Sequence, residues 1–221
     1  MPNYAVLWDL DGTIIDSAPY HERAWQTTFD AEGIPFDAAD FRRTFGWRND
    51  RILFDIVGPD LPPERVAALA QAKEEHYRAL VRQEGIAPLR GVRAWLERLH
   101  AQGIPQAIVS SAPRENITVV LATLDATDLF QALISGDDVA QGKPDPASFL
   151  LAARQLGVPP TACVVVEDAP AGVEAARRAG MTCLAVTTSH AREHLAADLV
   201  VDSLADLPAD TLERLSCKKL E

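Results

Sequence analysis

Five short apolar segments, most of them separated by helical patterns, constrain the fold of this chain more than any other feature. They span residues 4–8, 106–110, 131–135, 162–167 and 182–188. From residue 87 onward, each is preceded by a stretch in which apolar residues recur every three or four positions. Short buried strands that alternate with helices predict βαβ units. We therefore expect an α/β fold with a doubly wound, Rossmann-like parallel sheet.

Residues 17–86 interrupt this alternation. Their apolar residues have helical spacing, proline and glycine lie between the segments, and the stretch contains no strand-like run. The sequence thus predicts an α/β core domain made of residues 1–16 and 87–221. An all-α helical domain of residues 17–86 is inserted after the first strand.

Polar residues follow several of the predicted strands. In open α/β sheets the ligand site lies beyond the carboxyl ends of the strands, so residues distant in sequence should meet there. Lys143 is placed at the same edge because its loop, AQGKPDP, follows the strand at 131–135. The residues expected at this edge are Asp9, Asp11, Ser110, Lys143, Glu167 and Asp168.

The chemistry of these side chains points to phosphoryl transfer. Four carboxylates in one cleft raise one another's pKa, and a hard divalent cation with oxygen ligands such as Mg²⁺ relieves the repulsion. Lys143 and Ser110 are suited to hold a phosphoryl group. A carboxylate can attack phosphorus and form an aspartyl-phosphate, and a second aspartate can act as acid and base.

Each residue also has a simpler interpretation. Asp9 and Asp11 could be turn residues ahead of a helix that Asp16 or Ser17 caps. Lys143 could be a solvated surface lysine, but it is not a P-loop lysine, since proline follows it where serine or threonine is required. The convergence of several strand ends favours the functional interpretation.

Four stretches of the chain resemble the motifs of the haloacid dehalogenase-like superfamily. They are DLDGT at 9–13, the serine that ends AIVS at 110, GKPDP around Lys143, and VVVEDAPAG around Glu167 and Asp168. The resemblance covers nearly the whole chain. The helical insertion resembles the α-helical cap of the branch that contains β-phosphoglucomutases, phosphoglycolate phosphatases and small sugar phosphatases.

The resemblance implies a role for each residue. Asp9 is the nucleophile and Asp11 the general acid/base. Lys143 and Ser110 hold the phosphate, with Ser111 competing for the serine role. Mg²⁺ would be bound by the Asp9 carboxylate, the Asp11 backbone carbonyl, Glu167 and Asp168. An aspartate at position 11 separates the chain from the superfamily's dehalogenases, which lack it, and from its transport ATPases, which carry threonine there.

The predicted cap offers three candidate substrate contacts. His21, in SAPYHERAW, and Lys73, in AKEEHYRAL, resemble cap residues of β-phosphoglucomutases that face the substrate. The alternatives are a capped helix start and a solvated helix face, while Trp25 is expected in the core of the cap. The chain departs from the mutase pattern after Gly46, because Arg48 comes one residue early and the serine of that turn is missing.

We therefore predict a Mg²⁺-dependent phosphatase that acts on a small phosphorylated metabolite, with a sugar phosphate as the favoured substrate class. The alternative is a β-phosphoglucomutase-like mutase. A phospho-accepting receiver domain would also use a doubly wound sheet, aspartates, Mg²⁺ and a lysine. The paired aspartates of the first strand and the helical insertion both disfavour it.

Composition indicates which partners and which cellular location to expect for the chain. The net charge of −11 disfavours binding to nucleic acid or to anionic membranes, and no apolar run approaches the length of a membrane span. The first residues lack the basic region of a secretory signal, so a cytoplasmic monomer is expected. Cys163 and Cys183 lie in apolar segments and are expected to be buried thiols. The terminal KKLE carries no functional weight, and its origin is open.

Overall fold

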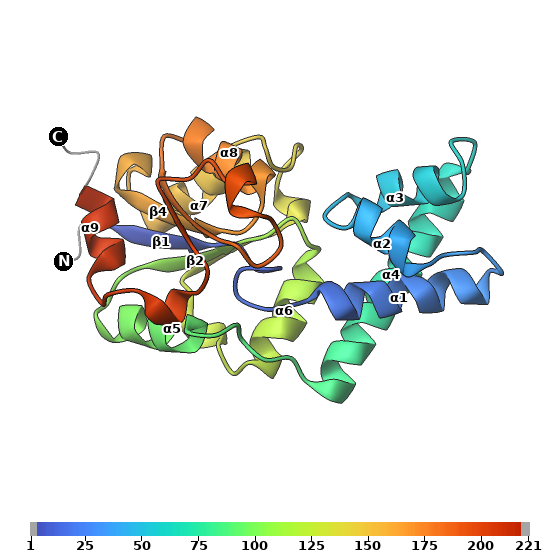
Figure 1. Ribbon diagram of the computed structural model, residues 1–221, viewed down its shortest axis with the longest axis horizontal. Coiled ribbons are helices and arrows are strands. Elements are labelled where there is room, and N and C mark those ends of the chain that lie inside the picture. Colours follow the sequence, from blue (N-terminus) through green and yellow to red (C-terminus); the bar gives the residue numbers. More distant parts are fainter. Residues whose placement is uncertain (1–3, 218–221) are drawn as a thin grey trace. The chain divides into compact units, whose positions relative to one another are not determined.

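The structure, a computed structural model, describes residues 4–217 and divides the chain into two compact units. One unit contains the residues up to Asp16 together with those from Ala87 onward, and the other contains Ser17–Ile86. Each unit is described by itself (Figure 1).

The first unit is built on a six-stranded sheet in which every neighbouring pair is parallel. The strand order is β3-β2-β1-β4-β5-β6. The strands are β1 (Ala5–Trp8), β2 (Gln106–Val109), β3 (Ala132–Ile134), β4 (Cys163–Glu167), β5 (Thr182–Val186) and β6 (Leu199–Val201). The predicted α/β, doubly wound fold class is confirmed.

Helices cover both faces of this sheet, and Figure 1 shows α7 and α8 on one face and α5 and α6 on the other. The helices of this unit are α5 (Val92–Ala101), α6 (Arg114–Thr123), α7 (Ala147–Leu156), α8 (Pro170–Arg178) and α9 (Thr211–Cys217). Because both faces are covered, every residue of β1, β2, β4 and β5 is buried. Cys163 and Cys183 are among these buried residues, as expected.

Strand β1 marks the switch point of the sheet. It pairs with β2 on one side and with β4 on the other, so the chain winds away from β1 in both directions. Ligands of doubly wound sheets bind outside the carboxyl ends of the strands at such a point. Asp9 follows directly after β1 and is therefore placed at this crevice.

The second unit consists of four helices around an aromatic core. They are α1 (Ala18–Ala31), α2 (Ala38–Thr44), α3 (Asn49–Ile56) and α4 (Pro63–Glu84). Trp25, at 2% exposure, belongs to this core as predicted. Asp37 caps α2 in a reciprocal capping box with Asp40. Proline in its first turn favours the start of α4, and Gly85 follows its end with a φ of 75°.

Within each unit, the segment where the chain leaves and the segment where it returns are joined by hydrogen bonds. In the helical unit, the Tyr20 hydroxyl donates to the Gly85 carbonyl at 2.7 Å. In the α/β unit, the Leu89 amide donates to the Ile14 carbonyl at 2.8 Å, and Ile15 forms an isolated bridge with Pro88. Segments on either side of the insertion are thus neighbours within each unit.

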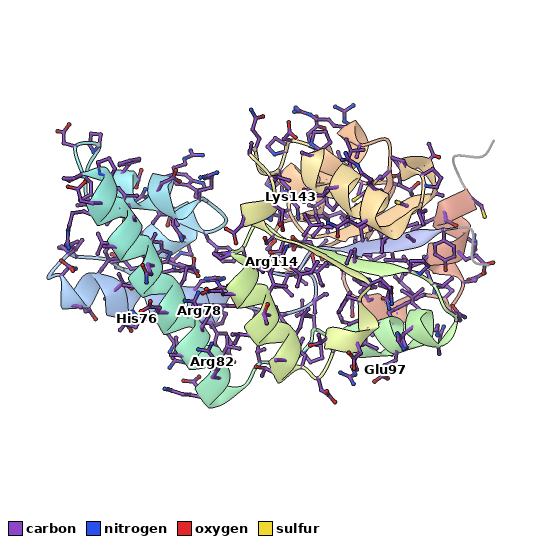
Figure 2. The ribbon with its side chains drawn as sticks, turned by 180° about the vertical axis from the view of Figure 1, so that it is seen from behind. His76, Arg78, Arg82, Glu97, Arg114 and Lys143 are labelled. Carbon is purple, nitrogen blue, oxygen red and sulfur yellow. The ribbon has the colours of Figure 1, made fainter. Side chains whose placement is uncertain are left out.

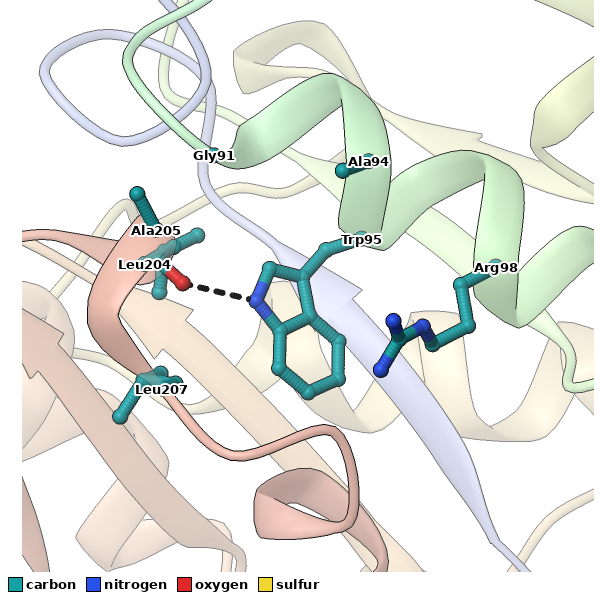
Figure 3. A pocket seen from close by; sticks show the side chains of 7 residues that line it. All are labelled: Gly91, Ala94, Trp95, Arg98, Leu204, Ala205 and Leu207. Carbon is teal, nitrogen blue, oxygen red and sulfur yellow. Dashed lines mark hydrogen bonds between the residues drawn. The ribbon is translucent and has the colours of Figure 1, made fainter.

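A pocket of about 210 Å³ lies between α5 and the segment that follows β6 (Figure 3). The indole of Trp95 donates to the Leu204 carbonyl at 2.9 Å, which joins α5 to the C-terminal segment. The lining contains none of the predicted site residues. No helix within residues 4–217 combines the length and apolar character needed to cross a bilayer.

Candidate active site

Lys143 organises the carboxylates at the edge of the sheet. Its Nζ donates to Asp9 Oδ1 at 2.6 Å, to Glu167 Oε1 at 2.7 Å and to the Val109 carbonyl at 3.0 Å. An ammonium group has three protons, and these three acceptors use all of them. The Lys143 side chain is 8% exposed, which rules out the solvated surface lysine. Figure 2 shows Lys143 in the loop before α7.

Glu167, the last residue of β4, is held at both carboxylate oxygens. Oε1 accepts from Lys143, and Oε2 accepts from the amides of Asp168 and Ala169 at 2.8 and 2.9 Å. Gly172 of α8 lies directly against this carboxylate. Position 172 requires glycine, because a Cβ there would lie 1.7 Å from Glu167 Oε1. The local backbone thus fixes the direction of this carboxylate.

Asp168 packs against the turn that follows β1. Its Oδ1 accepts from the Thr13 hydroxyl at 3.3 Å, and its Oδ2 accepts from the Ser189 hydroxyl. Gly12 has a φ of 86°, and a Cβ there would lie 2.0 Å from Asp168 Oδ2. The turn therefore requires glycine both for its positive φ and for the close approach of the carboxylate.

Ser110 lies beside the second aspartate. Its hydroxyl donates to Asp11 Oδ2 at 3.4 Å and accepts from the Ala112 amide at 3.0 Å. Ser110 is 3% exposed, whereas Ser111 is exposed. A Cβ on Gly136 would lie 2.4 Å from the Ser111 carbonyl, so this loop is packed tightly against the segment after β3.

The electrostatics of the site reflect burial of several like charges. Burial raises the pKa of Asp9 well above its usual range; Lys143 opposes the rise, and Glu167 adds to it. Burial and then Glu167 raise the pKa of Asp168 to about 7. Burial alone would lower the pKa of Lys143, but the Asp9 and Glu167 carboxylates hold it above its ordinary value.

The donor set fits a divalent metal ion. Asp9, Glu167 and Asp168 are buried, and each offers a carboxylate oxygen within 4.8 Å of the others. Oxygen ligands in such a group suit Mg²⁺ or another hard cation. The raised pKa values of Asp9 and Asp168 indicate that the lysine alone does not offset their charge.

The helical unit brings two of the three predicted cap residues together. Lys73 Nζ lies 2.8 Å from His21 Nδ1 and 2.9 Å from Glu74 Oε1, and the imidazole stacks on Tyr77 with centroids 4.2 Å apart. Lys73 is 3% exposed, so the alternative of a solvated helix face is wrong. Arg48 is different: its side chain is 76% exposed and pairs with Asp50 at 3.4 Å.

Two residues of this edge were missed in the sequence. Thr188 and Ser189 follow β5, and their hydroxyls donate to the Gly12 carbonyl and to Asp168, respectively. The signal was present, because Thr188 ends the strand predicted at 182–188 and Ser189 comes directly after it. Hydroxyls after a strand are common, however, and only the contacts distinguish these two.

Comparisons with known proteins identify the family of the chain. The profile of the haloacid dehalogenase-like hydrolase family matches residues 5–180. The chain belongs to this family. It is 36% identical to validoxylamine A 7'-phosphate phosphatase from Streptomyces hygroscopicus subsp. limoneus over 91% of this chain and 94% of that protein. It is 34% identical to β-phosphoglucomutase from Bacillus subtilis (strain 168), over 94% and 93% of the two chains.

A solved structure supports the same family assignment. The crystal structure of CbbY from Rhodobacter sphaeroides in complex with phosphate matches with a TM-score of 0.85 and 29% identity, covering 93% of this chain and 96% of that one. This haloacid dehalogenase-like hydrolase is therefore an enzyme of the β-phosphoglucomutase and phosphatase branch, a phosphohydrolase, as the sequence predicted.

Proposed function

We propose that this enzyme is a Mg²⁺-dependent phosphatase that hydrolyses a small sugar phosphate through an aspartyl-phosphate on Asp9. The observation that carries the proposal is the contact of Lys143 with both Asp9 and Glu167, next to Asp168 at the switch point of the sheet. The named relatives support the substrate class, because one is named as a phosphatase for validoxylamine A 7'-phosphate and another as a β-phosphoglucomutase.

In the first step Asp9 attacks phosphorus. Lys143 holds Oδ1 of the carboxylate at 2.6 Å, so Oδ2 is the oxygen that forms the new bond to phosphorus as the ester bond breaks. Asp11 gives its proton to the departing alkoxide of the metabolite. Lys143 offsets negative charge that develops on the phosphoryl oxygens, one of which would replace an acceptor that the lysine now has.

In the second step water hydrolyses the aspartyl-phosphate. Asp11, now ionised, takes a proton from the water, the bond between Asp9 and phosphorus breaks, and inorganic phosphate leaves. The Ser110 hydroxyl donates to Asp11 in the structure and would turn toward a phosphoryl oxygen when phosphate is bound. Ser111 remains the second candidate for that contact.

The metal ion would be held by Asp9, Asp168, Glu167 and the backbone carbonyl of Asp11. When bound, Mg²⁺ supplies a Lewis acid that neutralises charge on the phosphoryl group. Because Lys143 and two amides occupy the Glu167 oxygens, Asp9 and Asp168 are the stronger direct ligands in this set.

The helical unit would contact the part of the metabolite that carries no reacting phosphate. His21 and the buried Lys73 form a polar group beside aromatic rings, since Lys73 Nζ lies 5.5 Å from the Trp25 ring. Such a mixture of charge and aromatic surface suits a polyhydroxylated ligand. Arg48, on the exposed start of α3, is the third candidate contact.

A phosphate-release screen tests the proposal. Sugar phosphates, phosphoglycolate and nucleotides are each supplied with Mg²⁺ or with EDTA, and we expect Mg²⁺-dependent release from one or more sugar phosphates. Asp9→Asn should abolish release while the protein stays folded, and Asp11→Asn should lower kcat by about 10²–10⁴-fold. The exposed carboxylate of Asp16 provides the matched control, Asp16→Asn. An active Asp9→Asn enzyme would overturn the mechanism.

A second candidate is a β-phosphoglucomutase-like activity. The contact between His21 and Lys73, at the positions of mutase cap residues, and the identity of 34% to a β-phosphoglucomutase favour it. The exposed Arg48 at the altered turn speaks against it. Supplying β-glucose 1-phosphate with a glucose bisphosphate primer separates the two, because a mutase forms glucose 6-phosphate and a phosphatase releases phosphate and glucose.

The proposal also includes the binding partners, the cellular location and the oligomeric state of the enzyme. The 32 acidic residues exceed the 21 basic ones by 11, which supports an enzyme that binds neither nucleic acid nor membranes. We propose that it acts as a cytoplasmic monomer. Light scattering coupled to size-exclusion chromatography tests the oligomeric state, for which we expect the mass of one chain, 24.0 kDa.

A further inference from the structure

The segment after β5 reaches both parts of the proposed metal site with consecutive hydroxyl groups. Ser189 Oγ donates to Asp168 Oδ2 and lies 3.2 Å from the Asp168 carbonyl. The preceding hydroxyl, that of Thr188, donates to the carbonyl of Gly12 in the turn after Asp9 and Asp11. Two residues that follow β5 are thus hydrogen-bonded to the segments after β1 and β4, which carry the proposed metal ligands.

The direction of the Ser189 hydrogen bond follows from proton counting. A carboxylate that binds a metal is ionised and can only accept, so the single proton of the Ser189 hydroxyl goes to Asp168. His190 Nδ1 lies 2.8 Å from Ser189 Oγ and must then be the donor in that contact. The imidazole, the hydroxyl and the carboxylate form a chain in which every bond points toward Asp168.

This chain fixes how the Asp168 carboxylate is rotated. Thr13 holds Oδ1 at 3.3 Å, Ser189 holds Oδ2, and the backbone at Gly12 leaves no room for a Cβ on that side. A carboxylate has about four lone-pair sites, so two hydrogen bonds leave lone pairs to bind a cation. Hydrogen bonds of this kind orient ligands before the metal arrives.

We propose that Ser189 is a positioning residue for the metal site, which holds Asp168 in the orientation that binds Mg²⁺, while Thr188 fixes the turn at Gly12. The inference rests on the proposed function because it takes Asp168 as a ligand. Ser189 acts through Asp168 and touches no reacting atom. Its loss should therefore weaken metal binding and leave the chemical step intact once the metal is bound.

The test is Mg²⁺ binding to the metal-free enzyme, measured by isothermal titration calorimetry after EDTA treatment. Ser189→Ala should raise the Kd for Mg²⁺ about 10–100-fold, the usual effect of removing a group that orients a ligand. Ser189→Thr keeps the hydroxyl and should bind close to the wild-type level. Thr187→Val is the matched control, because that hydroxyl lies in the same segment but donates to Asp202 at 2.9 Å.

Kinetics give an independent readout. For Ser189→Ala the Mg²⁺ concentration for half-maximal phosphate release should rise by the same factor, and kcat at saturating Mg²⁺ should return close to that of the wild type. Urea unfolding in EDTA should show no loss of stability beyond that of Thr187→Val, because Ser189 is exposed.

The outcomes separate the two proposals. An unchanged Mg²⁺ Kd in Ser189→Ala overturns the positioning role and leaves the phosphatase proposal standing. Equal weakening by Thr187→Val also overturns it, because the segment and not the hydroxyl would then matter. A wild-type enzyme that binds no Mg²⁺ overturns both.

Discussion

The two units each bury a lysine, and they do so by different means. Lys143 in the α/β unit is bound by two carboxylates and a carbonyl that all belong to strands or their ends. Lys73 in the helical unit contacts Glu74, its neighbour on α4, and His21 on α1, beside the rings of Trp25 and Tyr77. The first environment is set by backbone pairing, and the second by side-chain packing between helices.

The difference matters for function. The strand register fixes where Asp9 and Glu167 lie, because all of β1 pairs with Cys163–Val166 of β4, and the two residues follow directly after this paired stretch. Chemistry at the end of a sheet is therefore tied to the most rigid part of the fold. A group formed between two helices can change through substitutions that leave the helices intact, which suits a role in substrate choice.

The largest expected effect comes from removing the strand-end lysine. Lys143→Met leaves Asp9 and Glu167 buried without their cation, and in EDTA it should lower the free energy of unfolding by about 3–5 kcal/mol. Urea unfolding measures this. Arg154→Met, at an exposed cation on α7, is the control and should stay within about 0.5 kcal/mol of the wild type. An equally small change for Lys143→Met would show that the buried carboxylates of Asp9 and Glu167 do not depend on this cation for stability.

A change that adds only a methyl group to α8 should disturb the same cluster by displacing the Glu167 carboxylate. Alanine usually stabilises a helix relative to glycine by about 1 kcal/mol. At Gly172 the sign should reverse, because the Cβ would lie 1.7 Å from Glu167 Oε1. We expect Gly172→Ala to cost about 1–3 kcal/mol, as overpacked cores do. A higher melting temperature for this variant would show that Glu167 can move freely.

Removing the helical lysine should have a smaller effect. Lys73→Met takes one donor from Glu74, but Asn49 Nδ2 still donates to Glu74 Oε1 at 2.8 Å. We expect a cost of about 1–2 kcal/mol in urea unfolding. The double variant Lys73→Met/Glu74→Gln should recover part of it, which gives a measurable coupling energy. A loss as large as that of Lys143→Met would mean that both lysines are equally structural.

The smallest effect concerns a turn at the edge of the sheet and depends on pH. The Ser135 amide and hydroxyl, with help from Arg114, lower the pKa of Asp138 to about 2. The ionised form is thus stabilised in the folded state; its contribution is complete above the ordinary value near 3.8 and is lost as the pH falls toward 2.

Asp138→Asn should therefore lower the melting temperature by roughly 2–4 °C at pH 7, and by less as the pH approaches 3. Asp137→Asn, at the neighbouring exposed carboxylate, tests whether any acidic residue in this turn gives the same pH profile. A loss for Asp138→Asn that does not change with pH would contradict the assignment.

The sequence predicted the parts of the fold that follow from periodicity. Alternating strand and helix patterns indicated the parallel sheet, and the rule for strand ends placed Asp9 and Lys143 at one edge, where they are in contact. Strand β6 was missed because it is three residues long and only partly buried. Helix α2 lies in the stretch 17–86 that was predicted to be helical, but its seven residues show too little periodicity to define its ends.

Contacts between side chains could not be predicted in the same way. The pairing of His21 with Lys73 depends on how α1 rotates against α4, which residue spacing leaves open. The burial of Glu74 and its bond to Asn49 depend on the same packing. Ser189 lies one position beyond the last residue predicted for its strand, and nothing in the local sequence indicates which acceptor its hydroxyl finds.

The ties at the ends of the insertion have a consequence for how the chain folds. The bridge between Ile15 and Pro88 makes these two residues neighbours in the α/β unit, although more than seventy positions separate them. In the helical unit, Tyr20 and Gly85 are joined by a hydrogen bond. Once the helices have formed, the entropy cost of closing that long loop has largely been met, so β2 can find β1 almost as if the insertion were a short turn. A chain organised in this way can exchange one helical insertion for another while the sheet still reaches its native order.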